Sequence, residues 1–301
     1  MDKTLHGSGQ NMASIADLEL AHALADRADA VTLDRFQSDD LKVATKADLS
    51  PVTDADRSTE AAIRELLAIH RPDDSIFGEE MGVTGSSTRQ WVIDPIDGTK
   101  NFLRGVPVWA TLIALAQDGE VTVGVVSAPA LGRRWWAGKG LGAYVGVQQA
   151  LRESSTCCGT NDCCADTPSS GAFDYVSAGQ RIHVSTIDRF EDASLSYSSL
   201  SGWKARGKLD HFLDLTDRMW RTRAYGDFWS YMMVAEGVCD IAAEPELETY
   251  DMAALVPIVT EAGGRFTSLL GDNGPWGGTG VATNGLLHDE VLQSLAWEEG
   301  L

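Results

Sequence analysis

The most informative stretch of this 301-residue chain is an apolar segment that runs directly into two acidic residues. Residues 91–93 have the composition of a buried strand. Asp94 and Asp97 follow on a turn in which Pro95 restricts the backbone and Gly98 permits a close approach. Two carboxylates placed in this way can converge on one point, where they repel each other unless a cation lies between them. A hard divalent ion such as Mg²⁺ suits an all-oxygen cluster of this kind.

Two further acidic motifs precede this one in the first half of the chain. Asp54 and Asp56 begin a predicted helix, and Glu79 and Glu80 follow Gly78. Each motif alone is more often a turn or a helix cap. Three such motifs, each next to an apolar segment, favour a shared cation site instead. Hydrolysis of a phosphate ester is the chemistry that such a site supports, because divalent ions activate water and neutralise a leaving oxygen.

The charge balance excludes several classes of partner. The chain has 24 Lys and Arg residues against 44 Asp and Glu residues, a formal net charge of −20. A nucleic-acid-binding protein needs a basic face, and an anionic membrane surface would repel this chain. No apolar run approaches the roughly 20 residues that span a bilayer. Residues 1–11 lack the apolar stretch of a secretory signal, so we expect no nucleic-acid or membrane partner and a cytoplasmic location.

The five cysteines do not form a disulfide framework by their number or spacing. Cys157, Cys158, Cys163 and Cys164 lie in two adjacent pairs whose spacing differs from that of common zinc sites. We interpret them as reduced thiols on a loop, with a structural metal as the less favoured alternative. Cys239 lies in an apolar run and is expected in the core.

Hydrophobic periodicity divides the chain into two structured parts around a polar segment. In the first part it predicts helices over 14–36 and 54–70, and strands of one sheet over 91–93, 111–116, 121–128 and 134–137. In the second part it predicts strands over 195–200, 239–243 and 265–268, and helices over 208–219, 227–236 and 252–262. We therefore predict an N-terminal α+β domain over 13–146, an inserted Ser- and Cys-rich loop over 147–178, and a C-terminal α/β domain over 179–301.

The ordered motifs resemble those of one family. Asp94-Pro95-Ile96-Asp97-Gly98-Thr99 with Asn101-Phe102 is similar to the signature of the inositol monophosphatase family of Mg²⁺-dependent phosphatases. Gly78-Glu79-Glu80 matches the family's upstream acidic motif. Tyr250-Asp251-Met252-Ala253-Ala254, followed by Thr260-Glu261-Ala262-Gly263-Gly264, matches the downstream one. The resemblance implies a layered α-β-α-β-α sandwich of the inositol monophosphatase and fructose-bisphosphatase type, and a hydrolase of small phosphate monoesters that forms homodimers.

The resemblance also implies a site for two Mg²⁺ ions and a third, weaker one. Glu79, Asp94 and the Ile96 carbonyl would bind the first ion. Asp94, Asp97 and Asp251 would bind the second, and Glu79 would hold the third through water. Tyr250 departs from the family, which usually has tryptophan there, but both residues are aromatic and we expect Asp251 to be held in the same way.

Further residues take roles in the reaction by the same resemblance. Thr99, paired with Asp56, would position the attacking water, with Glu79 as the third catalytic group. The amides of Gly98 and Thr99 would receive the phosphate. Lys46 matches a family lysine near the metal site, and Glu80 is an adjacent, supporting acid.

The stretch from Ala224 to Ser230 resembles the histidinol-phosphate phosphatase branch of the family, which acts in histidine biosynthesis. Asp227 stands where inositol-cleaving relatives carry a small or hydroxyl residue, and Glu244 maps to the family's substrate-hydroxyl ligand. Histidinol phosphate carries an ammonium and an imidazole, and two carboxylates would pair with these cations. The structural alternatives are a helix N-cap for Asp227 and a loop acid before Pro245 for Glu244.

Three alternatives to histidinol phosphate hydrolysis remain open. One is an inositol-1-monophosphatase or another small-molecule phosphatase of the same superfamily. A nucleotide phosphatase would need an aromatic or basic pocket, for which Trp229 is the single candidate. A non-catalytic relic is disfavoured because the set of acids is complete.

Overall fold

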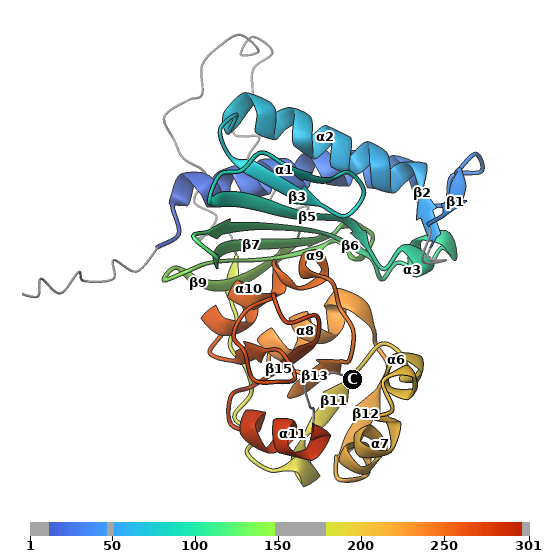
Figure 1. Ribbon diagram of the computed structural model, residues 1–301, viewed down its shortest axis with the longest axis vertical. Helices are drawn as coiled ribbons and strands as arrows, with labels where there is room; N and C mark the ends of the chain where they lie inside the picture. The colour runs from blue at the N-terminus through green and yellow to red at the C-terminus, as the bar shows by residue number, and fades with distance from the viewer. Residues whose placement is uncertain (1–11, 47–50, 148–178, 297–301) are drawn as a thin grey trace, which may run out of the picture.

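The structure is a computed structural model that describes residues 12–46, 51–147 and 179–296, and its helices and sheets alternate as five layers (Figure 1). Helices α1 and α2 cover one face of an eight-stranded sheet. Helices α8, α9 and α10 lie between that sheet and a five-stranded sheet, and α6, α7 and α11 cover the far side of the second sheet. The predicted α-β-α-β-α sandwich is therefore confirmed.

The first half of the described chain supplies seven strands of the eight-stranded sheet and its outer helices. Its helices are α1 (Ile15–Arg35), α2 (Asp54–His70), α3 (Thr99–Leu103) and the 3-10 helix η1 (Pro129–Leu131). Its strands are β1 (Val43–Thr45), β2 (Pro51–Thr53), β3 (Ser75–Gly78), β4 (Gly82–Thr84), β5 (Arg89–Asp97), β6 (Ala110–Gln117), β7 (Glu120–Ala128), β8 (Arg133–Gly138) and β9 (Gly142–Val147).

The second half supplies the five-stranded sheet and β10, an edge strand of the eight-stranded sheet. Its strands are β10 (Gln180–Arg181), β11 (Ser194–Ser196), β12 (Arg221–Arg223), β13 (Ile241–Glu244), β14 (Arg265–Thr267) and β15 (Gly280–Thr283). Its helices are η2 (Phe190–Asp192), α6 (Leu200–Ala205), α7 (Leu209–Asp217), α8 (Asp227–Ala235), α9 (Thr249–Met252), α10 (Leu255–Glu261) and α11 (His288–Leu295).

The strand orders are β10-β9-β8-β7-β6-β5-β3-β4 in the first sheet and β12-β11-β13-β15-β14 in the second. In the first sheet the neighbours are antiparallel except β3 and β5. In the second, β11 is parallel to β12 and β13, and the remaining pairs are antiparallel. Strands β1 and β2 form a separate hairpin.

Alternation along the strands creates separate cores on the two faces of each sheet. In β5, Trp91 and Ile93 pack under α1 and α2, whereas Val92 faces the central helical layer. In β13, Ala242 faces the central layer, whereas Ile241 packs against the outer helices. The central core thus receives apolar side chains from both halves of the chain. The division into domains at 13–146 and 179–301 stays a prediction.

The helices predicted over 14–36 and 54–70 are confirmed as α1 and α2, and the four predicted strands of the first sheet are confirmed as β5 to β8. Ser14 occupies the N-cap position of α1, but its side chain makes no capping hydrogen bond. The side chain of Ile15 is exposed rather than part of the core face. Cys239 is buried, as expected. The other four cysteines and 148–178 lie outside the described residues.

Two predicted elements of the second half are wrong in extent. The helix predicted over 252–262 is interrupted between α9 and α10, because Pro257 has no amide hydrogen to donate to the Ala253 carbonyl one turn earlier. The strand predicted over 195–200 ends at Ser196. The hydroxyl of Ser199 accepts the Ser201 amide and begins α6 instead.

Strands β9 and β15 and helix α11 were not predicted, and they are short or flanked by polar segments. Among the described helices, none is both long enough and apolar enough to cross a bilayer.

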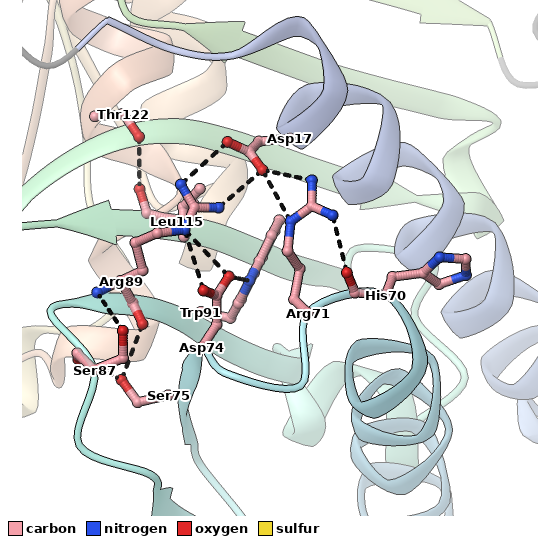
Figure 2. Close-up of polar contacts among 10 residues, drawn as sticks. All are labelled: Asp17, His70, Arg71, Asp74, Ser75, Ser87, Arg89, Trp91, Leu115 and Thr122. Atoms are coloured by element: carbon pink, nitrogen blue, oxygen red, sulfur yellow. Dashed lines mark hydrogen bonds and ion pairs between the residues drawn. The ribbon is translucent and has the colours of Figure 1, made fainter.

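An ion-pair network joins α1, the end of α2 and β5 at one end of the first sheet (Figure 2). The buried carboxylate of Asp17 accepts hydrogen bonds from Arg71 and Arg89, each at 2.9 Å from Oδ1. Asp74 accepts from Arg89 at 3.1 Å and from the indole of Trp91 at 2.9 Å. Two acids therefore pair with two arginines, and these ion pairs link three elements that are distant in sequence.

Asp17→Asn should lower the free energy of unfolding, because the substituted amide leaves two partly buried guanidinium groups without their charge partner. We expect the free energy of unfolding, measured in urea, to fall by about 1–2 kcal/mol. The loss stays modest because solvent screens the partly exposed arginines. Asp34→Asn, at an exposed position on the same helix, is the matched control. Equal losses in the two variants would contradict the role given to the network.

Gly124 in β7 lets the central helices approach the first sheet closely. A β-carbon at this position would lie 2.3 Å from the Ala254 carbonyl oxygen and 2.7 Å from the Pro257 ring. Ala254 directly precedes α10, and α9 ends two residues before it, at Met252. The distance between the sheet and the α9–α10 segment is therefore set by the missing side chain at Gly124.

Gly124→Ala should push this segment away from β7. We expect it to lower the midpoint of thermal unfolding by at least about 2 °C, since overpacking costs about 1–3 kcal/mol. Thermal unfolding followed by circular dichroism measures the effect. An unchanged midpoint would show that the contact is not tight.

Candidate active site

A β-bulge in β5 brings Asp94 and Asp97 to the same side of the strand. Asp94 pairs with Leu112 of β6 and Asp97 pairs with Ala110, and the register shifts between them. In a regular strand, residues three apart point to opposite faces, and the extra residue of a bulge reverses that. The predicted turn is thus an irregular part of the strand. The Ile96 amide donates to Asp94 Oδ1 at 2.9 Å and fixes that carboxylate.

Asp251 comes to the same point from the second half of the chain. It lies on the short helix α9, where its carboxylate accepts the Glu248 amide at 2.8 Å in a capping box. Carboxylate oxygens of Asp94, Asp97 and Asp251 all lie within 4.8 Å of one another. The ring of Tyr250 packs edge-on against Phe77 with the centroids 5.9 Å apart. Tyr250 thus packs against β3, and that Asp251 is held as in the relatives with tryptophan stays a prediction.

Burial and mutual repulsion change the acidity of these three groups. Burial, followed by the charges of Glu79, Asp97 and Asp251, raises the pKa of Asp94 well above its ordinary value. Burial and the charges of Asp227 and Asp251 likewise raise the pKa of Asp97, although the Phe228 amide donates to Asp97 Oδ2 at 2.7 Å. Burial raises the pKa of Asp251 to about 7. The donor set of closely spaced carboxylate oxygens fits a hard divalent cation, which would relieve the repulsion.

Glu79 stands beside this cluster at the end of β3. Its amide donates to the Ile93 carbonyl at 3.1 Å, which places it next to β5. Lys46 pairs with Glu79 at 2.7 Å and with Glu80 at 2.5 Å. The structure thus brings Lys46 to both acids, and Glu80 is held against the lysine rather than against Asp94.

Glu60 on α2 supports this corner and was missed by sequence reasoning. Its buried carboxylate accepts the amides of Glu80 at 2.7 Å and Met81 at 3.2 Å and pairs with Arg64 at 2.8 Å. A β-carbon on Gly78 would lie 2.1 Å from Glu60 Oε1, so the turn that carries Glu79 fits closely over Glu60. The available signal was an acid one turn after Asp56 on the predicted helix.

Asp56 and Thr99 lie together, as the resemblance implies. Thr99 Oγ1 is 3.3 Å from Asp56 Oδ1 and 3.0 Å from the Ile96 carbonyl oxygen. The other oxygen of Asp56 accepts the Thr53 amide at 2.7 Å and completes the capping box of α2. Burial raises the pKa of Asp56. Asp56 therefore both caps a helix and orients the Thr99 hydroxyl.

The two carboxylates expected to recognise substrate lie near each other but are not equally accessible. Asp227 lines the site and accepts a hydrogen bond from Asn101 Nδ2 at 2.9 Å. Its carboxylate does not cap α8, because the N-cap position belongs to Gly226. Glu244 is buried at the end of β13, and burial raises its pKa to about 7. Its carboxylate accepts the Ser198 amide.

A cavity of about 290 Å³ collects most of the expected residues. Its lining consists of Pro51, Glu79, Asp94, Ile96, Asp97, Gly98, Thr99, Lys100, Asp227 and Asp251. Glu244 and Asp56 are buried and are not part of the lining. Lys100 is the cation that sequence reasoning missed at this cavity. A larger cavity of about 520 Å³, bordered by Trp276 and Lys139, contains none of the expected site residues.

The raised pKa values predict how Mg²⁺ affects stability. In the metal-free protein, the carboxyl groups of Asp94, Asp97 and Asp251 bind protons more tightly when folded than when unfolded. Their contribution to stability is present at low pH and is lost as the pH rises through the raised pKa of each group, which is about 7 for Asp251. Mg²⁺ should therefore raise the midpoint of thermal unfolding more at pH 8 than at pH 5.5.

At pH 8 without metal, Asp251→Asn should melt at least about 2 °C above the wild type, because it removes one of the repelling charges. Differential scanning fluorimetry measures both effects. If Mg²⁺ raises the midpoint of thermal unfolding equally at the two pH values, and Asp251→Asn melts below the wild type, the three carboxylates do not repel one another in the metal-free protein.

Comparison with known proteins agrees with this geometry. The model of the inositol monophosphatase family matches residues 16–300. A histidinol-phosphatase of Streptomyces coelicolor is 55% identical over 280 residues, which cover 92% of this chain and 95% of the relative. A histidinol-phosphatase of Mycobacterium tuberculosis is 54% identical over 282 residues, which cover 93% of this chain and 97% of the relative.

Solved structures show the same fold. An inositol monophosphatase from Zymomonas mobilis superposes with a TM-score of 0.74 at 31% identity, over 94% of this chain and 98% of that one. An inositol monophosphatase of Thermotoga maritima gives a TM-score of 0.75 at 27% identity, over 93% and 97%. The resemblance inferred from the motifs is thus confirmed. The chain belongs to the inositol monophosphatase family of metal-dependent phosphate monoester hydrolases.

Proposed function

We propose that this enzyme hydrolyses histidinol phosphate with Mg²⁺, a reaction of histidine biosynthesis. The observation that carries the proposal is the position of Asp227, a carboxylate on the wall of the same cavity as the acidic cluster. A neutral polyol phosphate needs no such anion, whereas histidinol phosphate carries an ammonium and an imidazole. The relatives from Streptomyces coelicolor and Mycobacterium tuberculosis, both named as histidinol-phosphatases, support this choice.

In this proposal Asp94, Asp97 and Asp251 hold one ion, and Glu79, Asp94 and the Ile96 carbonyl hold another, with a third, weaker ion at Glu79. When bound, divalent ions lower the pKa of a water and neutralise charge on the phosphate. The donors are all oxygens, as Mg²⁺ requires. Glu79 has to exchange Lys46 for metal, since the lysine pairs with its carboxylate at 2.7 Å.

The chain's own groups position the reactants. The Thr99 hydroxyl carries one proton, and when it donates this proton to Asp56 its oxygen lone pairs are free to accept a hydrogen bond from the attacking water. Gly98 and Thr99 begin α3, where the first amides have no acceptor within the helix and can receive a phosphate oxygen. Gly98 has φ +85°, a conformation that glycine adopts without strain.

At the other end of the cavity, Asp227 would pair with a cationic group of the substrate. Its Oδ2 is occupied by Asn101, and Oδ1 accepts no hydrogen bond from any residue that the structure describes. Glu244, whose pKa is raised to about 7 by burial, would lie behind it and ionise as a cation approaches. Lys100 is a cation, in contrast to these two acids, and it lines the cavity next to the phosphate-binding turn.

The homodimer and the cytoplasmic location stay predictions from the resemblance and the sequence. Size-exclusion chromatography with light scattering would test the dimer directly.

Asp227→Asn tests the substrate. The change keeps the size of the side chain but removes its charge, so KM for histidinol phosphate should rise by roughly tenfold or more, as the loss of a hydrogen-bonded ion pair predicts. KM for 4-nitrophenyl phosphate, which carries no cation, should change by less than about threefold. Phosphate release at saturating Mg²⁺ provides both values.

Asp210→Asn, at an exposed position on α7, is the matched control and should change neither KM. Equal rises for the two substrates in Asp227→Asn would mean that Asp227 does not select a cationic ester, and the assignment of histidinol phosphate would lose its main support.

A further inference from the structure

The backbone of Asp227 is held in an uncommon conformation. Its φ is +47°, in the left-handed region that non-glycine residues rarely adopt, and it is the first residue of α8. Such a conformation persists only where surrounding contacts stabilise it. In the described part of the chain, two polar contacts hold this residue, one at its amide and one at its carboxylate.

The first contact comes from the connection between β11 and α6. Ser198 Oγ accepts the Asp227 amide at 2.9 Å. The second comes from α3, where Asn101 Nδ2 donates to Asp227 Oδ2 at 2.9 Å and to the Val108 carbonyl at 2.9 Å. The carboxylate also lies against Gly98, where a β-carbon would be 3.3 Å from Oδ2. Asp227 is therefore fixed at both ends.

Ser198 makes a second contact of its own. Its amide donates to Glu244 Oε1, so one residue contacts the backbone of Asp227 and the carboxylate of Glu244, the two residues that sequence reasoning assigned to the substrate. Ser198 is half-buried and is not part of the cavity lining. Because the hydroxyl serves Asp227 and the amide serves Glu244, the two contacts can be separated by substitution.

We infer that Ser198 is a positioning residue for substrate selection, which holds the strained Asp227 backbone at a fixed position relative to Glu244, so that Asp227 meets the cationic end of the substrate and the buried Glu244 supports it from outside the cavity lining. This inference rests on the proposed function. Ser198 itself contacts neither the phosphate-binding turn nor the acidic cluster, and the Phe228 amide makes a separate contact with Asp97, so loss of the Ser198 hydroxyl should affect recognition of the cationic group more than the hydrolysis step.

Ser198→Ala tests the inference because it removes the acceptor of the Asp227 amide and keeps the amide that Glu244 needs. We expect KM for histidinol phosphate to rise roughly three- to tenfold with kcat nearly unchanged, as the loss of one hydrogen bond predicts. KM for 4-nitrophenyl phosphate should stay within about twofold. Ser198→Thr keeps a hydroxyl and should restore most of the preference for histidinol phosphate.

Ser199→Ala is the matched control. The neighbouring serine is exposed and its hydroxyl caps α6, so its loss should leave both KM values unchanged. Thermal unfolding of each variant shows whether the fold is intact.

A double-mutant cycle tests whether Ser198 acts through Asp227. If it does, Ser198→Ala in the Asp227→Asn background should raise KM for histidinol phosphate by less than about twofold further. If the rises in KM from the two substitutions multiply in the double variant, the inference is overturned but the proposed function is not. The same holds if Ser198→Ala keeps the full preference for histidinol phosphate over 4-nitrophenyl phosphate. A wild type that hydrolyses 4-nitrophenyl phosphate but not histidinol phosphate would instead overturn the proposed function, and the inference with it.

Discussion

The repulsion between three closely spaced carboxylates, one buried and two half-buried, is the constraint on which the rest of the site depends. Asp94 and Asp97 share one strand, Asp251 comes from a helix more than 150 residues later, and their oxygens lie within 4.8 Å of one another. Such a cluster is unfavourable unless protons or cations neutralise it. The raised pKa values of all three groups express this cost in the metal-free protein.

The fold holds these charges together through contacts made elsewhere. The bulge in β5 aligns Asp94 with Asp97, and the close contact at Gly124 sets the distance of the α9–α10 segment that carries Asp251. The amide of Phe228, the second residue of α8, donates to Asp97, so the helix that begins with Asp227 is also tied to the cluster. Metal binding and substrate recognition therefore share one scaffold, in which the two halves of the chain meet at the cavity.

Much of this could be predicted from local sequence, and the failures have physical reasons. The long helix α2 and the strands β5 to β8 have strong periodicity, and the acids at their ends follow an ordered pattern that a family resemblance recognises. The bulge could not be predicted, since Pro95 and Gly98 fit a turn equally well. Ser198, Asn101 and Glu60 were missed because their roles arise from contacts across elements. The break at Ala253 was readable from Pro257, but the apolar run around it resembled one continuous helix.

The central claim is that Asp94, Asp97 and Asp251 form a cation site shared by the two halves of the chain. The most direct test is a crystal structure of the protein with Mn²⁺, whose anomalous scattering locates the ions independently of any assumed ligand. The account predicts an anomalous peak within coordination distance of all three carboxylates, at roughly 2.0–2.3 Å from their oxygens. A Mn²⁺-containing crystal with no peak among these three residues, or with ions bound only elsewhere, would contradict it.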